Sequence, residues 1–220
     1  MSAPPPTPQV AVRGEARLVV DPEIATVVVT VRTHARDRQT ALERCRAGQD
    51  EVTAVLTAAG ASVESVETAG LAVYPEQREG RREESAATVT TQVTVAELDA
   101  VGDLVVALGR LPDVTVSGPH WRLRPDSPAV EQARLAAVDD AVHRARQYAA
   151  AVGARLTALL EISDVGLSSA RPRVAAPVAA MARFATEELR LDLAPAPQEV
   201  LGSVEVRFTM TPPDQEVFAG

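Results

Sequence analysis

The chain has 220 residues, of which 46% are hydrophobic and 24% charged, and its formal net charge is -8. This length allows a substantial core, and the composition is that of an ordinary globular protein. The acidic balance argues against nucleic acid and anionic lipid as partners, because both repel a negatively charged surface and no basic stripe offsets it. Aromatic residues make up only 3%, so the core must be built from Val, Leu and Ala.

The number of cysteines and lysines excludes several kinds of site. The single cysteine, Cys45, excludes an intramolecular disulfide and a cysteine-rich metal site, and its place in an amphipathic segment predicts a buried, inert thiol. All 22 basic residues are arginine, which removes Schiff-base and P-loop lysine chemistry.

The N-terminal stretch bears on location. The first residues, "MSAPPPTPQV", have no basic region followed by an apolar one, so we do not expect them to act as a secretory signal. No segment reaches the roughly 20 apolar residues that cross a bilayer. These features lead us to expect a cytoplasmic protein without membrane insertion.

Strand and helix periods alternate along the first half of the chain. Residues 1–9 predict a flexible, proline-rich tail. The β-branched runs "VAVRGEARLVV" and "IATVVVTVRT" flank the turn signal "DPE", which predicts an antiparallel hairpin. From Asp37 to Ala59 the apolar spacing becomes three and four, which predicts a helix that Asp37 caps and Gly60 ends.

The middle of the chain predicts two strands, a short helix and a third strand, over 63–74, 87–95, 97–109 and 114–123. The charged stretch "PEQREGRREE" between the first two strands predicts an exposed loop. Gly118-Pro119 predicts a bulge or bend in the last of these strands.

The second half opens with the longest helix. Ser127 and Pro128 are a capping residue and a first-turn proline, and Gly153 marks the helix end. The stretch "ARLTALLEIS" predicts a strand, 164–197 a long loop or insertion, and "QEVLGSVEVRFTM" a last strand. We therefore expect one domain over 10–211 and a flexible tail over 212–220. The order ββαββαβαββ predicts an α+β fold, with antiparallel sheets that carry the Ala-rich helix and a second amphipathic helix.

The long helix carries the most suggestive polar cluster, with His143 four residues from Asp139 and Arg144 four from Asp140. Pairs at this spacing share one helix face. A metal site usually needs three or four protein ligands. The other two histidines, His34 and His120, are not at ligand spacing. We therefore expect a solvated, salt-bridged face and no metal site. The alanine stripe of the same helix predicts close packing on its own sheet or, less simply, on a neighbouring subunit.

No nucleophile, phosphate-loop or metalloprotease motif is present, so we assign no catalytic residue, cofactor or metal. Two groups remain as candidate binding residues. Apolar side chains within the 164–197 segment would be unusual if fully exposed, and they predict packing on the domain or against a partner subunit: Val174, Val178, Met181, Phe184, Leu189 and Leu191. Trp121, beside His120, is a recognition candidate, although a core or interface role for this tryptophan is the simpler reading.

Four stretches together resemble the SIMPL-domain family. They are the opening "VRGEARLVVDPEIATVVVTVRT", the segment "TALERCRAGQDEVTAVLTAAGASVESVETAGLAVYPE", the helix "EQARLAAVDDAVHRARQYAAAVGARLTALLEISD" and the final "PQEVLGSVEVRFTM". The resemblance covers roughly residues 9 to 211, and the order and spacing of the stretches give it its specificity. Ala16 stands where the family has a second glycine, "DPE" where it has Pro-Asp, and Cys45-Arg46 where asparagines are common.

The resemblance implies an α+β domain that assembles into large ring- or channel-like homo-oligomers, with a link to stress tolerance and, in animals, to kinase-pathway adaptors. It supplies no catalytic residues. Many relatives carry a signal peptide and work in the periplasm or outer envelope, a location that we do not transfer to this chain.

Three functional hypotheses follow. The first is a non-enzymatic protein whose main partner is itself, in a ring, channel or cage with a scaffold or compartment role. The second is a binding module, monomeric or dimeric, that recognises a small molecule or an unidentified protein through His120, Trp121 and the 76–84 loop. The third, a hydrolase or redox enzyme that uses Cys45 or His143, has the least support.

Overall fold

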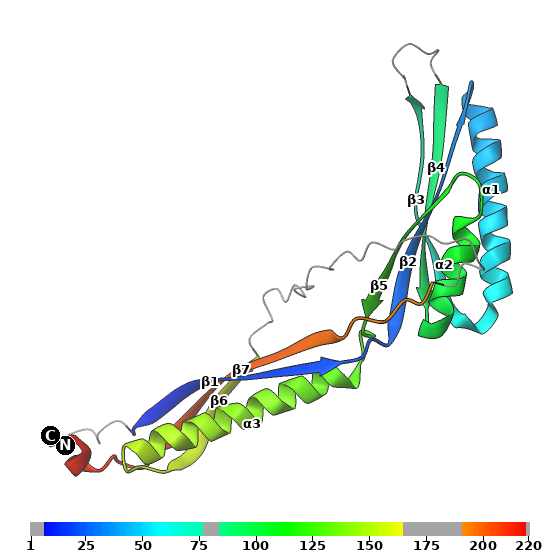
Figure 1. Ribbon diagram of the computed structural model, residues 1–220. Helices are drawn as coiled ribbons and strands as arrows, with labels where there is room; N and C mark the ends of the chain where they lie inside the picture. The colour runs from blue at the N-terminus through cyan, green and yellow to red at the C-terminus, as the bar shows by residue number, and fades with distance from the viewer. Residues whose placement is uncertain (1–6, 77–83, 165–190, 219–220) are drawn as a thin grey trace. The chain divides into compact units, whose positions relative to one another are not determined.

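The computed structural model describes residues 7–76, 84–164 and 191–218. The chain divides into two compact units (Figure 1). Unit 1 comprises Met1–Val20, Pro125–Met181 and Glu199–Gly220, and unit 2 comprises Asp21–Arg124 and Ala182–Gln198. Each unit contains one sheet with helix packed on it, which confirms the α+β class predicted from the sequence.

Unit 2 contains a four-stranded antiparallel sheet in the order β3-β4-β2-β5. The strands are β2 (Ile24–Ala35), β3 (Val63–Glu76), β4 (Glu84–Val95) and β5 (Val114–Arg122). Two helices accompany them, α1 (Arg38–Ala59) and α2 (Val101–Gly109). The short helical turn η1 (Gly60–Ser62) follows α1, and η2 (Leu98–Ala100) precedes α2.

The core of unit 2 lies between the helices and one face of the sheet. Alternate residues of β2 point into it, with Val27, Val29 and Val31 at most 1% exposed. The helix α1 contributes Ala41, Cys45, Val52 and Leu56. The predicted caps are confirmed: the Asp37 carboxylate accepts the Thr40 N–H at 2.8 Å, and Gly60 adopts a positive φ of 59°.

Unit 1 contains a three-stranded sheet in the order β1-β7-β6, formed by β1 (Gln9–Val20), β6 (Leu156–Asp164) and β7 (Gln198–Met210). The long helix α3 (Pro128–Ala151) lies along one face (Figure 1). Its stripe of alanines at every fourth position is fully buried, at 0% exposure for Ala133, Ala137, Ala141 and Ala145. Ser127 caps the helix and Pro128 opens it, as predicted.

The helix α3 approaches its sheet so closely that two strand positions accept only glycine. A Cβ atom on Gly14 of β1 would overlap the Ala137 carbonyl oxygen, and one on Gly202 of β7 would overlap the Ala133 carbonyl oxygen. The alanine stripe therefore packs on its own sheet, the simpler of the two expectations. The resulting core of unit 1 is thin, with Val12, Val204, Val206 and Phe208 facing the alanines.

The predicted hairpin of the first two strands is wrong, since β1 and β2 belong to different sheets. Both edges of β2 are already occupied, one by β4 and the other by β5. With no free edge on β2, β1 pairs with β7 instead. The bend predicted at Gly118-Pro119 is confirmed by a register shift in β2–β5 between Thr26 and Val28, opposite this dipeptide, whose peptide bond is cis.

The tail and loop segments differ in part from expectation. Gln215–Phe218 forms a short helical turn, η3, and the Asp214 N–H donates to the Val152 carbonyl at 3.0 Å, so this part of the predicted flexible tail is structured. Of the 164–197 segment, 165–190 lie outside the described residues, and Leu193 packs against the core of unit 2. Within the described part of the chain, no helix has the length and apolar character to cross a bilayer.

Candidate functional site

The polar cluster around His143 is a solvated helix face, as predicted. His143 is exposed and its ring shares a 3.0 Å hydrogen bond with the Gln147 amide. Arg144 Nε lies 2.9 Å from Asp140 Oδ2. Among the described residues, no group of three or more His, Cys, Asp or Glu side chains converges as a metal site would require.

Asp140 of this cluster has a second role that the sequence did not reveal. Its carboxylate accepts a 2.9 Å hydrogen bond from the backbone N–H of Glu15, on β1. That bond, followed by the Arg144 hydrogen bond, holds the pKa of Asp140 below its ordinary value of 3.8. Since β1 is an edge strand, the side chain occupies a backbone donor that would otherwise face a further strand.

The opposite edge of the same sheet has very different surroundings. In the described part of the chain, β6 pairs only with β7, and α3 lies mainly against β1. Three large apolar side chains of β6 are therefore about half exposed: Leu159 at 55%, Leu160 at 49% and Ile162 at 53%. A row of apolar side chains on an edge strand is unusual, because natural edges are commonly blunted by charge or proline.

An apolar niche adjoins this exposed strand. It has a volume of about 280 Å³ and lies where α3 meets β6 and β7, lined by Arg134, Val138, Ile162, Asp164, Ser203 and Val204. Two charged groups stand among these residues, with Arg134 Nε 3.9 Å from Asp164 Oδ2. This long, exposed contact contributes little to stability and leaves both groups accessible to a partner.

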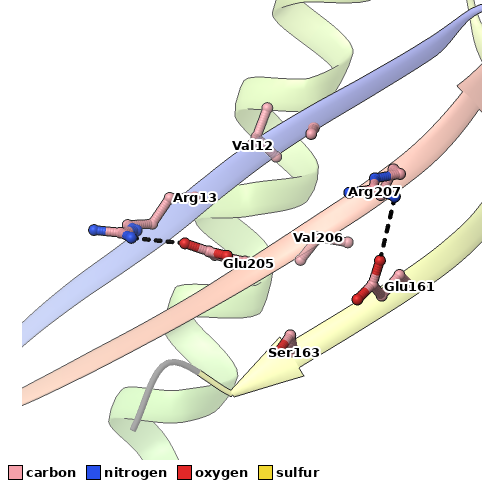
Figure 2. A pocket seen from close by; sticks show the side chains of 8 residues that line it. Val12, Arg13, Glu161, Ser163, Glu205, Val206 and Arg207 are labelled. Atoms are coloured by element: carbon pink, nitrogen blue, oxygen red, sulfur yellow. Dashed lines mark hydrogen bonds and ion pairs between the residues drawn. The ribbon is translucent and has the colours of Figure 1, made fainter.

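The other face of the unit 1 sheet carries paired charges and a second hollow of about 350 Å³ (Figure 2). Arg13 of β1 contacts Glu205 of β7 at 2.6 Å, and Arg207 of β7 contacts Glu161 of β6 at 3.5 Å. Figure 2 shows these side chains on the strands, with α3 behind. Since each charge already has a partner of opposite sign, the hollow offers no unbalanced charge to a ligand.

The structure does not bring His120 and Trp121 together on one surface. Trp121 lies opposite Ala25 of β2 and packs against the core of unit 2, which matches the simpler reading of this residue. His120 lies opposite Thr26 and is exposed on the other face of the sheet. Most of the 76–84 loop lies outside the described residues, and the strands leading into it pair with the Ala35 end of β2, away from Ala25 and Thr26.

Of the apolar candidates in the 164–197 segment, the described residues include only Leu191, near its end. Val174, Val178, Met181, Phe184 and Leu189 lie outside the described residues. Leu191 is half-buried, and its carbonyl lies where a Cβ atom on Gly102 of α2 would be. Its surroundings are therefore those of a segment packed on its own unit.

Cys45 is buried on α1, 1% exposed, with its thiol 3.8 Å from the Val31 carbonyl oxygen. Burial raises the pKa of this thiol above its ordinary value of 9.0, which disfavours the reactive thiolate. The prediction of a buried thiol is confirmed, and this environment argues against a nucleophilic role.

Sequence reasoning missed both edge features of unit 1. An exposed β6 was detectable in principle, because "LTALLEIS" has no proline and a single charged residue, whereas proline and charge are usual marks of a protected edge. The contact between Asp140 and Glu15 was not detectable, since 125 residues separate them and no local pattern indicates it.

Comparison with known proteins gives a family and two named relatives. Residues 10–208 match the SIMPL family, described as a protein of unknown function. The chain is 30% identical over 188 residues to the 26 kDa periplasmic immunogenic proteins of Brucella melitensis and Brucella abortus, which covers 78% of this chain and 70% of each relative. No enzyme family is indicated by these matches.

These relatives overturn the expected cytoplasmic location, because both are named as periplasmic proteins. That expectation was drawn only from the composition of the first residues and of the longest apolar stretches, whereas the relatives match over most of the chain. The family match spans nearly the whole chain and agrees with the resemblance carried by its opening strand and long helix. The chain belongs to the SIMPL family.

Proposed function

We propose that this protein is a non-enzymatic component of the bacterial periplasm that works by self-assembly into a large homo-oligomer, with a scaffold or compartment role. One observation carries the proposal: unit 1 keeps large apolar side chains at its surface although its own core is thin. Eight of the twelve large hydrophobic residues exposed in the described part of the chain belong to unit 1.

The energetics favour a partner for that surface. Burying a Leu or Ile side chain completely contributes about 1.5–3 kcal/mol. Leu159, Leu160 and Ile162 leave roughly half of that contribution unrealised. A three-stranded sheet covered by one helix has little other apolar area to bury, and association supplies more. The resemblance to the SIMPL family implies such assembly, and the names of the relatives support the proposed periplasmic location.

The mass of the purified full-length chain tests the proposal. One chain weighs 23.2 kDa. Light scattering on a sizing column should give one discrete mass many times larger, and negative-stain images of that peak should show uniform rings or shells. A monodisperse species at the monomer mass would overturn the proposal.

Cell fractionation tests the proposed location separately. The native protein should be released with the periplasmic fraction by osmotic shock, together with a periplasmic marker enzyme. Retention with a cytoplasmic marker would contradict a periplasmic role while leaving the mass measurement unaffected.

A further inference from the structure

The two edges of the unit 1 sheet differ in how they meet their surroundings. At the β1 edge, Asp140 accepts the Glu15 N–H, and Gly14 brings the strand against the backbone of α3. At the β6 edge, no described element pairs with the outer side of the strand, and its apolar side chains stay exposed. Of the two, β6 is the edge open to another strand.

The strand β3 is the nearest competitor, because it is an edge strand of the unit 2 sheet with exposed apolar residues of its own. Both β3 and β6 have two register shifts, so regularity does not separate them. Their chemistry does. Gly70 and Pro75 interrupt β3, and its Glu64 is engaged with Arg124 at 2.6 Å. In β6, by contrast, Leu159 and Leu160 are consecutive at the strand centre.

We propose that β6 of unit 1 lies side by side and antiparallel with β6 of a second copy of this chain, about a two-fold axis at Leu160. This inference rests on the proposed self-assembly and names its contact. Leu160 is the midpoint of the nine-residue strand Leu156–Asp164, so this axis uses the whole strand on both copies. Leu160 lies at the register shift between Leu159 and Glu161 and has no partner on β7, so the contact is centred on this irregularity. Such a two-fold contact uses the same patch on each subunit.

Charge complementarity supports a second copy as the occupant. Arg155 directly precedes the strand and Asp164 is its last residue. Antiparallel pairing brings the Arg155 end of each strand next to the Asp164 end of the other. Arg155 is exposed, and within the described part of the chain Asp164 has the single long contact of 3.9 Å with Arg134, so both are accessible to form the intermolecular pair.

The niche beside β6 fits the same occupant. Its wall includes Ile162 and Val138, and it adjoins the strand that meets the partner. An apolar side chain from the second copy's β6 would fill it, and the two-fold axis would make the fit reciprocal. Apolar side chains seated in such pockets are the usual energetic centres of interfaces.

Disulfide trapping tests the geometry in a Cys45→Ala background of the full-length chain. Leu160→Cys lies on the proposed axis and should link to its own copy, so most chains should form covalent dimers under mild oxidation. Thr157→Cys and Ser163→Cys lie off the axis, on opposite sides of it. Each alone should give several-fold less dimer, whereas a mixture of the two should cross-link.

The matched control is Leu71→Cys, a residue 63% exposed on the edge strand β3 of the other sheet. Equal cross-linking by Leu71→Cys would overturn the inference, as would equal self-linking at Thr157, Leu160 and Ser163, which indicates parallel pairing. Absence of a Leu160→Cys dimer would also overturn it, whether residues 165–190 or another protein cover the strand.

Light scattering separates this inference from the proposed function. Leu160→Asp places two like charges on the axis and should reduce the assembly mass by at least half, whereas Leu71→Asp should leave it unchanged. Circular dichroism checks that both variants fold. A wild-type monomer would remove both proposals. A large wild-type assembly that Leu160→Asp leaves intact would remove only the β6 contact.

Discussion

Glycine at two strand positions sets how close α3 comes to the sheet of unit 1. The backbone of Gly14 and the backbone of α3 leave no room for a Cβ atom, and Gly202 is in the same situation. The atoms that an added Cβ would meet belong mainly to the helix backbone, and they cannot rotate away as a flexible side chain can. The effect of a single added methyl group at these positions is therefore predictable.

Gly14→Ala should destabilise unit 1 strongly. The added methyl overlaps Ala137 and Ala141 of the helix, and overpacking of this kind costs about 1–3 kcal/mol. Urea unfolding followed by circular dichroism measures the loss. The control is Gly70→Ala on β3, where no atom lies within 4 Å of the added methyl group. It should change the free energy of unfolding by less than about 0.5 kcal/mol, and an equal effect of the two variants would contradict the close approach.

Cys45 allows a second prediction for a single residue. Because burial raises the pKa of the thiol, the native protein should resist a thiol alkylating reagent up to about pH 9 and react fully once denatured. Mass spectrometry of the alkylated chain gives the result. Stoichiometric labelling of the native protein would mean that the helix α1 exposes this residue.

Elements of this fold differ in how far the sequence predicts them. Helix ends are local, so Asp37, Ser127 and Gly60 identify them through capping chemistry alone. Strand pairing is not local. The turn "DPE" predicts a β1–β2 hairpin, but competition from β4 and β5 for the edges of β2 decides the outcome. The solvated face of His143 was predictable from spacing, whereas the edge contact of Asp140 depends on tertiary structure.

The contact between α3 and β1 should make stability depend on acidity. The pKa of Asp140 is lowered in the folded chain, so its contribution is complete above the ordinary value of 3.8 and is lost as the pH falls through the lower folded value. Asp140→Asn should cost about 1 kcal/mol at pH 7, because it weakens a hydrogen bond to a charged acceptor that is partly exposed.

The difference between wild type and Asp140→Asn should shrink as urea unfolding is repeated at successively lower pH below 3.8, because protonation of Asp140 removes the charge by which the two proteins differ. Asp139→Asn is the control, because Asp139 is the adjacent exposed carboxylate. A gap between wild type and Asp140→Asn that persists unchanged at low pH would mean that the negative charge contributes nothing to the contact.

At the scale of the whole molecule, the two-fold contact at β6 constrains the assembly. If every subunit pairs through β6, subunits enter the oligomer two at a time, and the number of subunits should be even. Native mass spectrometry of the intact assembly measures that number against the 23.2 kDa chain mass. A dominant odd-numbered species would exclude pairing of every subunit through this strand.

The hydrogen bond at the edge of β1 bears on whether the paired sheets can add further strands. When two β6 strands meet, the joined sheet ends at a β1 strand on each side, and there Asp140 already occupies the Glu15 N–H. A further strand would therefore find one of its donors on β1 already taken, which disfavours growth beyond the pair. A protein that pairs through an exposed apolar edge strand ordinarily risks unlimited strand addition into fibrils. On this arrangement a carboxylate on α3, by occupying a backbone donor of the outer strand, would help to keep the paired sheets from growing into a fibril.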